Sequence, residues 1–221
     1  MNLPRRPAAI VFDMDGLLFD TETLYQEAAI LAAADGGHNV SFSQTIGLPW
    51  PQSRSVLLAH FGLSFPVEEF VATWVRHFEV LAATRLALKP GAIELLNTLD
   101  DLGLPRAIAT SSARETVEHH LQFHDLVGRF HHIVGHGDYA VGKPAPDPFL
   151  KAAERLGVEP RSCLALEDSH NGVRSAAAAC MMTVMVPDLL EPTEEIRGLC
   201  AFVARDLHEV RDLLLVAEVS S

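Results

Sequence analysis

The stretch VFDMDGLLFDTETLY, residues 11–25, places two aspartates on alternate positions directly after an apolar run. The run at residues 8–12 predicts a strand buried on both faces, as in a parallel sheet. Alternate residues of an extended chain lie on one side, so Asp13 and Asp15 are expected to lie on the same side, about 7 Å apart. Gly16 lets the chain turn sharply after them. Two like charges at the end of a buried strand need a nearby cation, which points to a functional site.

The same pattern of a short apolar run followed by polar or turn residues recurs along the chain. Further buried strands are predicted at residues 107–109, 132–134, 163–166, 183–186 and, more weakly, 201–203. Segments with helical spacing separate them, at residues 91–102, 114–123, 147–156 and 172–179. Strands that alternate with helices of about ten residues predict βαβ units and a parallel α/β sheet.

One interval interrupts this alternation. Its segments ETLYQEAAILAAADG, QSRSVLLAHFG and VEEFVATWVRHFEVLAATRLAL have helical spacing and contain no convincing strand. The interval follows the first strand directly and ends at Lys89-Pro90-Gly91, where proline and glycine suit a turn back into the next unit. We therefore expect a helical domain at residues 19–88, inserted into an α/β core made of residues 1–18 and 89–221.

Composition excludes several classes of partner. The chain has 29 acidic and 17 basic residues and a formal charge of -12, which repels nucleic acid and anionic membrane surfaces. Its N-terminal apolar run is too short for a signal peptide, and no stretch approaches the ~20 apolar residues of a membrane span. The three cysteines, Cys163, Cys180 and Cys200, form no CxxC pair and are expected to be core thiols. We expect a cytoplasmic monomer, with a dimer as the alternative.

Polar residues follow three of the predicted strands. Asp13 and Asp15 follow the first, the triplet Thr110-Ser111-Ser112 follows the second, and Glu167-Asp168 follows the strand at 163–166. The carboxyl ends of parallel strands share one edge of the sheet, where ligands bind. Lys143 lies in the loop after the strand at 132–134, on the same edge. These side chains are therefore expected to converge.

Such a collection of side chains suits phosphate chemistry. Clustered carboxylates repel one another unless a cation lies among them, and a ligand set of oxygens without His or Cys favours Mg²⁺. A metal held by acids, together with a lysine and hydroxyl donors, stabilises the charge of a phosphoryl group. An aspartate beside the metal can then act as the nucleophile, and a second can carry the proton.

The ordered motifs resemble those of the haloacid dehalogenase (HAD) superfamily. They are Asp13-Met14-Asp15-Gly16, then Thr110, then Gly142-Lys143-Pro144, then Glu167-Asp168, and the interval at 19–88 resembles the helical cap of subfamily I. The resemblance covers nearly the whole chain. It implies a Rossmann-like core with an inserted cap, and a Mg²⁺-dependent phosphatase that works through an aspartyl-phosphate.

The resemblance also implies a role for each matching residue. Asp13 would attack phosphorus, and Asp15 would serve as general acid and then base, with its backbone carbonyl on Mg²⁺. Thr110, Ser111 and Lys143 would bind the phosphoryl oxygens. The implied metal ligands are Asp13, Asp15, Asp168 and Glu167, with Glu167 alternatively a partner for Lys143. Asp15 excludes the dehalogenases of the superfamily, which lack an aspartate at that position.

The expected substrate is a small phosphorylated metabolite of the sugar phosphate or nucleoside phosphate type, and the expected reaction is hydrolysis of a phosphomonoester. A transfer like that of β-phosphoglucomutase is the alternative, since that enzyme shares all four motifs. Its cap carries a basic loop, whereas the corresponding stretch here, Thr45 to Trp50, is apolar, although Arg54 or Arg76 could substitute. A non-catalytic phospho-acceptor domain is less favoured because such domains lack the helical insertion.

A group of histidines between residues 119 and 136 invites a second metal hypothesis. His120 and His124 are four residues apart on a predicted helix, but no acid or thiol completes a site. We therefore expect these two histidines to lie on an exposed helix face.

Overall fold

The computed structural model describes residues 3–38 and 50–219 of the chain. These residues form two compact units. One unit is Asp20–Ala87, and the other is built from the segments on either side of it, up to Phe19 and from Leu88 onward. No helix of the described part is long and apolar enough to cross a membrane.

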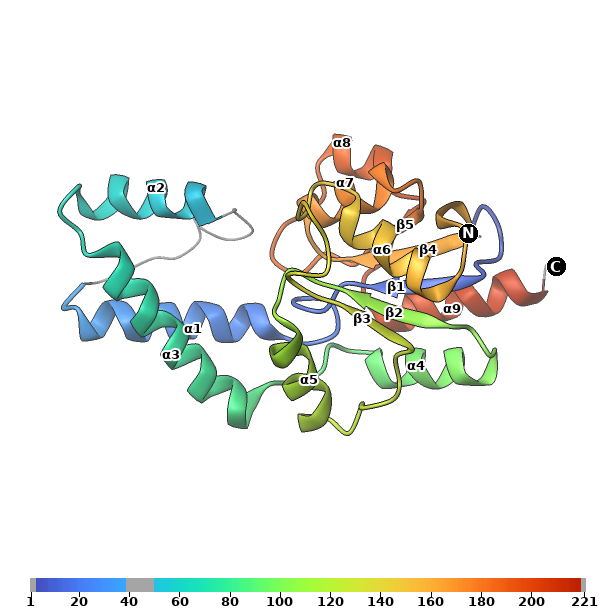
Figure 1. The fold of residues 1–221 in the computed structure, drawn as a ribbon, viewed down its shortest axis with the longest axis horizontal. Helices are drawn as coiled ribbons and strands as arrows, with labels where there is room; N and C mark the ends of the chain where they lie inside the picture. The colour runs from blue at the N-terminus through green and yellow to red at the C-terminus, as the bar shows by residue number, and fades with distance from the viewer. Residues whose placement is uncertain (1–2, 39–49, 220–221) are drawn as a thin grey trace. The chain divides into compact units, whose positions relative to one another are not determined.

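The larger unit contains a sheet of six strands, all pairs of which are parallel. The strands are β1 (Ala9–Phe12), β2 (Arg106–Ala109), β3 (His132–Val134), β4 (Cys163–Glu167), β5 (Met182–Met185) and β6 (Phe202–Val203). Their order across the sheet is β3-β2-β1-β4-β5-β6, so β1 is central and the winding reverses direction beside it (Figure 1). The predicted parallel α/β sheet is confirmed.

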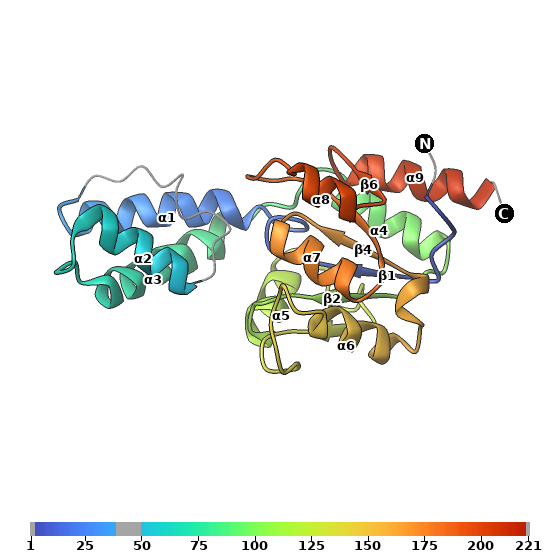
Figure 2. The same cartoon turned by 90° about the horizontal axis from the view of Figure 1, so that it is seen from above.

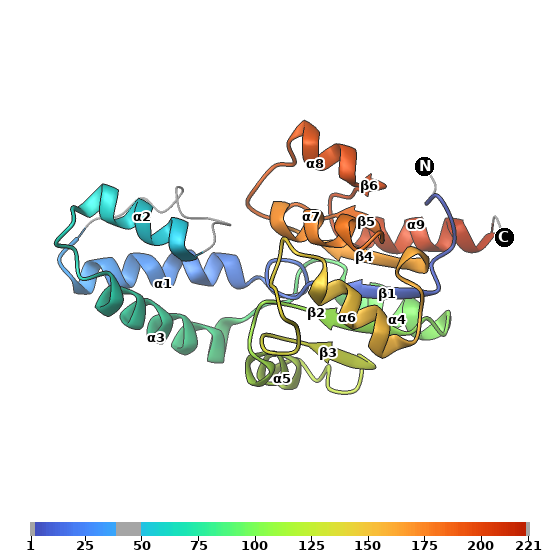
Figure 3. The same ribbon diagram turned by 45° about the horizontal axis from the view of Figure 1, so that its top comes forward.

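Helices cover both faces of this sheet (Figures 2 and 3). Helices α6 (Asp147–Leu156) and α7 (His170–Ala178) lie on one face, and α4 (Ala92–Asp101) and α9 (Leu207–Val219) lie on the other. The remaining helical segments of this unit are α5 (Arg114–Phe123), η2 (Pro160–Ser162) and α8 (Glu194–Leu199). The predictions from sequence did not include α8 and α9, which follow the last strong strand signal.

The central strands are buried because both of their faces are covered. All four residues of β1 are fully buried, and those of β2 are buried too, including Arg106 at its start. On the α6 and α7 side, Val11, Ala107 and Ala165 pack in one cluster with Phe149, which is the largest buried side chain there. Small residues on the strands leave room for that ring, so α6 can lie close to the sheet.

The smaller unit consists of α1 (Thr21–Asp35), α2 (Trp50–Phe61) and α3 (Val67–Arg85). Helices α1 and α3 pack along each other, and the indole N–H of Trp74 donates to the carbonyl of Tyr25 at 2.8 Å. The ring of Tyr25 also stacks on Phe78, with centroids 3.8 Å apart. Of the stretch Thr45 to Trp50, residues 45–49 lie outside the described residues, and of Trp50 only the helical backbone is described.

The cysteines differ from expectation at one position. Cys163 is buried and Cys200 is half-buried, but Cys180 is exposed. Cys180 has φ +62°, in the left-handed turn that follows α7, and the adjacent Met181 is buried in its place. The prediction that Cys180 is a core thiol is wrong, because the turn rotates this side chain toward solvent.

Two glycines flank α4, and replacing each in turn tests how closely the start of α4 packs against the start of α9. Both have positive φ, +86° at Gly91 and +62° at Gly103, but a Cβ on Gly91 would overlap the backbone of Leu207 and His208, whereas one on Gly103 would meet nothing within 4 Å. Gly103→Ala is therefore expected to lower the free energy of unfolding by about 1–2 kcal/mol, for the left-handed backbone alone. Gly91→Ala is expected to lose about 1–3 kcal/mol more, measured by urea denaturation. Equal losses would contradict this account.

Candidate active site

The candidate site lies where the carboxyl ends of β1, β2 and β4 meet. Phe12 is in register with Ile108 of β2 and with Leu166 of β4, so the residues that follow these strands lie side by side. The amide of Asp13 donates to the carbonyl of Leu166 at 2.9 Å, which continues the pairing by one residue. This register brings Asp13, Thr110 and the end of β4 to one edge of the sheet.

Three carboxylates converge at this edge. Asp13, Glu167 and Asp168 each offer an oxygen, and these atoms all lie within 4.8 Å of one another. Asp13 is 6% exposed and Glu167 is fully buried. Among the residues that the structure describes, this is the only group of three or more metal-ligating side chains in range of one another.

Lys143 lies among these acids. Its ammonium donates to Oδ1 of Asp13 and to Oε1 of Glu167, the latter at 2.5 Å, and its side chain is 8% exposed. One buried cation therefore faces two buried acids. Such an arrangement is stable only because the attraction offsets the large cost of removing the charges from water.

Burial and neighbouring charges shift the protonation of this group. Desolvation raises the pKa of Asp13 to about 8, since the repulsion from Glu167 and Asp15 adds to it and the attraction of Lys143 opposes it only in part. Desolvation lowers the pKa of Lys143, but attraction to Asp13 and Glu167 outweighs it and the net pKa is raised. Lys143 is therefore charged at neutral pH. Its single positive charge is not enough to keep Asp13 ionised beside the other acids.

The donor set fits Mg²⁺. It consists of carboxylate oxygens alone, with neither imidazole nor thiolate among them. Two glycines keep the carboxylates close to the backbone, since a Cβ on Gly16 would overlap the carboxylate of Asp168 and one on Gly172 would overlap that of Glu167. Gly16 also has φ +80°, which suits glycine. A larger residue at either position would displace the carboxylate of Asp168 or Glu167, so the residues present suit the metal that the sequence implies.

Hydroxyl groups after β2 hold Asp15. The hydroxyl of Ser112 donates to Oδ2 of Asp15 at 2.6 Å, and that of Thr110 donates to the same oxygen at 3.4 Å. Thr110 is 1% exposed, whereas Ser111 is exposed and its side chain interacts with Tyr139. The sequence predicted a phosphate-binding role for Ser111 and gave Ser112 no role of its own. The chain bends at Ser111 and Ser112 after β2 ends at Ala109, so no strand periodicity marked Ser112 in advance.

The loop that carries Lys143 is fixed by residues that the sequence did not single out. The carboxylate of Asp138 accepts from Arg155 at 2.6 Å, from the amide of Gly135 at 3.0 Å and from Arg114 at 3.2 Å. These bonds lower the pKa of Asp138 to about 2, with the Arg155 bond the largest cause. Tyr139 donates its hydroxyl to the carbonyl of Thr110 at 3.1 Å and so ties the loop to the end of β2.

The histidine prediction is wrong for His120. His120 is 2% exposed, and its ring packs edge-on against Phe19, with centroids 5.5 Å apart. His124 stacks on the same phenyl ring at 5.4 Å. Burial lowers the pKa of His120, which disfavours its charged form. Phe19 covers the face of α5 that was expected to meet solvent. The helical periodicity of α5 alone could not show this contact, because Phe19 lies about 100 residues earlier in the chain.

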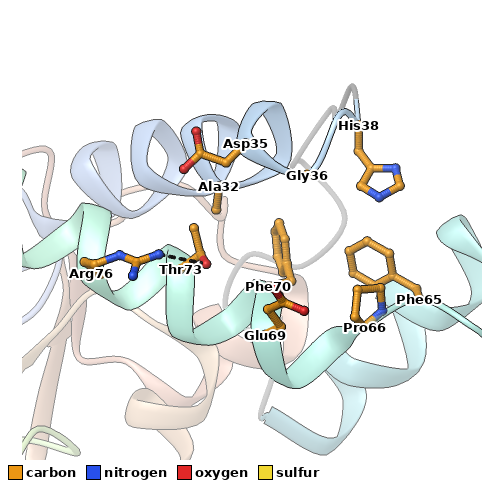
Figure 4. Close-up of a pocket in the computed structure, with 10 residues that line it drawn as sticks. All are labelled: Ala32, Asp35, Gly36, His38, Phe65, Pro66, Glu69, Phe70, Thr73 and Arg76. Atoms are coloured by element: carbon orange, nitrogen blue, oxygen red, sulfur yellow. Dashed lines mark hydrogen bonds between the residues drawn. The ribbon is translucent and has the colours of Figure 1, made fainter.

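A cavity of about 220 Å³ lies wholly within the smaller unit (Figure 4). Phe65 and Phe70 form part of its wall, and Asp35, Glu69 and Arg76 supply charge of both signs. Arg76 donates to the hydroxyl of Thr73 at 3.1 Å. None of the predicted site residues lines this cavity.

Comparisons with known proteins agree with the family resemblance. A family model described as haloacid dehalogenase-like hydrolase matches residues 7–179. The chain is 40% identical over 193 residues to a probable pseudouridine-5'-phosphatase of Drosophila melanogaster, covering 83% of each chain. It is 33% identical to hexitol phosphatase B of Escherichia coli K12, over 85% of this chain and 86% of the relative. The solved structure of a putative β-phosphoglucomutase from Thermotoga maritima matches 96% of this chain and 99% of its own, with 26% identity and a TM-score of 0.78.

The raised pKa of Asp13 predicts a pH dependence of stability in the absence of divalent metal. The folded protein holds the proton of Asp13 up to about pH 8, whereas the ordinary pKa of the side chain is 3.8. The folded state therefore binds more protons between these values, and the stabilisation is lost as pH rises through 8. In chelator, the melting temperature of the wild type relative to Asp13→Asn, which cannot ionise, is expected to fall between pH 6 and pH 9. Parallel curves for the two proteins would refute the shift.

Proposed function

The chain belongs to the haloacid dehalogenase-like hydrolases and is a phosphatase, and on that premise we propose that it hydrolyses a small phosphomonoester through an aspartyl-phosphate intermediate. The observation that carries the proposal is the convergence of Asp13, Glu167 and Asp168 around one point, with Lys143 between two of them. Such a site suits a phosphoryl group. Lys143 attracts its negative charge, and the acids can hold the divalent cation that this group also needs.

Asp13 is the nucleophile. Its carboxylate lies at the end of the central strand, and Lys143 fixes one of its oxygens. In the first step a carboxylate oxygen of Asp13 bonds to phosphorus while the bond from phosphorus to the ester oxygen breaks. Because β1 and its neighbours hold the Asp13 backbone, little motion is needed to aim the carboxylate.

Asp15 carries the proton. It donates a proton to the leaving ester oxygen in the first step and takes one from the attacking water in the second, which releases inorganic phosphate and restores Asp13. The hydroxyls of Ser112 and Thr110 hold its Oδ2. They orient the carboxylate while its other oxygen exchanges the proton.

The phosphoryl oxygens are bound by Thr110, Ser111 and Lys143. The raised pKa of Lys143 keeps its ammonium charged throughout the pH range of the reaction. The implied metal ligands are the carboxylates of Asp13, Asp168 and Glu167 and the backbone carbonyl of Asp15. When bound, Mg²⁺ neutralises these acids and the charge that develops on the phosphoryl group. Glu167 also pairs with Lys143, so it serves both groups.

The substrate class follows from the relatives. Two of them are named for phosphorylated pseudouridine and hexitol, which are a nucleoside and a sugar alcohol. We infer a phosphorylated sugar or nucleoside, with the inserted unit at residues 19–88 acting as the cap that selects it. The formal charge of -12 makes a small anion held by local cations the natural ligand, rather than a polyanion.

Hydrolysis is favoured over mutase action because the two arginines that a mutase could use to hold a second phosphate already have partners. Arg54 is paired with Glu68 at 3.2 Å, and Arg76 donates to Thr73. Both guanidinium groups thus already have partners within their own unit. The phospho-acceptor alternative is disfavoured by the phosphatase relatives and by the separate helical unit.

Phosphate release should depend on Asp13 and on divalent metal. With a panel of phosphorylated sugars and nucleosides, the wild type is expected to release phosphate over many turnovers with Mg²⁺ and to stop in chelator. Asp13→Asn is expected to lose at least about 10³-fold in kcat, since no other group can form the covalent intermediate. Release of phosphate in a single turnover only, or at the same rate in chelator, would overturn the proposal.

The fate of the phosphoryl group separates the phosphatase from the mutase. Glucose 1-phosphate supplied with a trace of glucose 1,6-bisphosphate is expected to yield free phosphate and glucose, without accumulation of glucose 6-phosphate. Formation of glucose 6-phosphate faster than phosphate, followed by phosphorus NMR, would instead establish transfer. Arg54→Met serves as the control, because a paired surface arginine should not affect hydrolysis.

A further inference from the structure

Asp188 lies next to the carboxylate site without belonging to the motifs that define it. It follows β5, at the same edge of the sheet as the ends of β1 and β4. Its Oδ1 accepts from the ammonium of Lys89 at 2.7 Å, and the two side chains are only 12% and 19% exposed. This pair joins segments 99 residues apart in the sequence.

The second oxygen of Asp188 faces the site. A Cβ placed on Gly16 would overlap the carboxylate of Asp168 and would lie 3.4 Å from Oδ2 of Asp188. The two carboxylates therefore meet across the bare Cα of Gly16. Oδ2 of Asp188 is buried and accepts no hydrogen bond from any residue that the structure describes.

A buried carboxylate oxygen without a donor is costly, since it has lost its water and gained nothing in return. Lys89 stabilises the charge through the other oxygen but does not satisfy this one. Asp168, the neighbour across Gly16, is itself an acceptor when ionised. The described residues thus supply no donor to this oxygen, and a donor bound at the site would satisfy it.

A water molecule on Mg²⁺ is the donor that this position suits. Mg²⁺ keeps several waters when proteins bind it, and a bound water is a strong hydrogen-bond donor. Asp188 is not part of the group whose oxygens all lie within 4.8 Å of one another, so it lies outside the inner ligands Asp13, Glu167 and Asp168. Its distance from the cluster thus suits contact through water.

We propose that Asp188 is a positioning residue of the metal site: its Oδ2 accepts a hydrogen bond from a water on the Mg²⁺ held by Asp13, Glu167 and Asp168, and Lys89 fixes its orientation. The inference rests on the proposed function, which supplies the Mg²⁺. It gives the ion pair a role beyond joining two loops. Carboxylates in this outer position raise metal affinity and orient the inner ligands.

The test is Mg²⁺ binding to the full-length chain without substrate, measured by isothermal titration calorimetry. Asp188→Asn keeps the shape of the side chain and removes its charge, and it is expected to raise the Kd for Mg²⁺ about 10-fold. Glu195→Gln is the matched control. It removes an acid of the same charge from an exposed pair with Arg174, at 2.8 Å, and is expected to leave the Kd unchanged.

A double variant guards against misfolding, because Asp188→Asn leaves the partly buried Lys89 without this counter-charge. Asp188→Asn with Lys89→Met removes both charges and keeps the net charge of the chain. It is expected to keep most of the loss in Mg²⁺ affinity. A Kd within twofold of the wild type in the double variant would overturn the proposal and leave the pair a purely structural one.

The same titrations separate this inference from the function on which it rests. A wild type that neither binds Mg²⁺ nor needs it for phosphate release would overturn the proposed function, and the role of Asp188 with it. A wild type that binds Mg²⁺ and hydrolyses phosphomonoesters, beside Asp188 variants that bind Mg²⁺ equally well, would overturn the role of Asp188 alone.

Discussion

The ammonium of Lys143 between the buried carboxylates of Asp13 and Glu167 is the interaction on which the rest of the site depends. Without it, the buried acids at the end of the central strands would have no counter-charge, at a cost of several kcal/mol for each ionised group. The lysine offsets this cost in part, as the raised pKa of Asp13 indicates. Because the remaining negative charge is fixed by the backbone of β1 and β4, the site is already prepared for a divalent cation before one binds.

Most of the contacts around this interaction hold Lys143 and the neighbouring carboxylates in place. Asp138 fixes the loop of Lys143 by accepting from Arg155, Arg114 and the amide of Gly135. Gly16 and Gly172 let the backbone approach the carboxylates of Asp168 and Glu167 more closely than any side chain allows. The positions of the charged groups are therefore fixed by neighbouring residues that do not take part in the reaction. This is usual where charges must be held within a fraction of an ångström.

Much of the fold was predictable because its signals are local. Short, mostly apolar runs of three to five residues predicted the five strongest strands, and helical spacing predicted helices such as the one at residues 147–156. The parallel arrangement followed from the alternation of these elements, and it predicted one shared edge for the acids. The exposure of Cys180 and the burial of His120 were not predictable, since each depends on a turn or a ring supplied by another part of the chain.

The sequence by itself determined the fold class, the family, and the residue types at the ends of the strands, because these follow from periodicity and from motifs of adjacent residues. Only the tertiary structure decided which of those residues touch. It chose Ser112 for the bond to Asp15, placed Lys143 between Asp13 and Glu167, and brought Lys89 to Asp188 across 99 residues. The end of a strand places a residue at the edge of the sheet. Which side chain it contacts there depends on the register and packing of other segments, and these have no fixed spacing in the sequence.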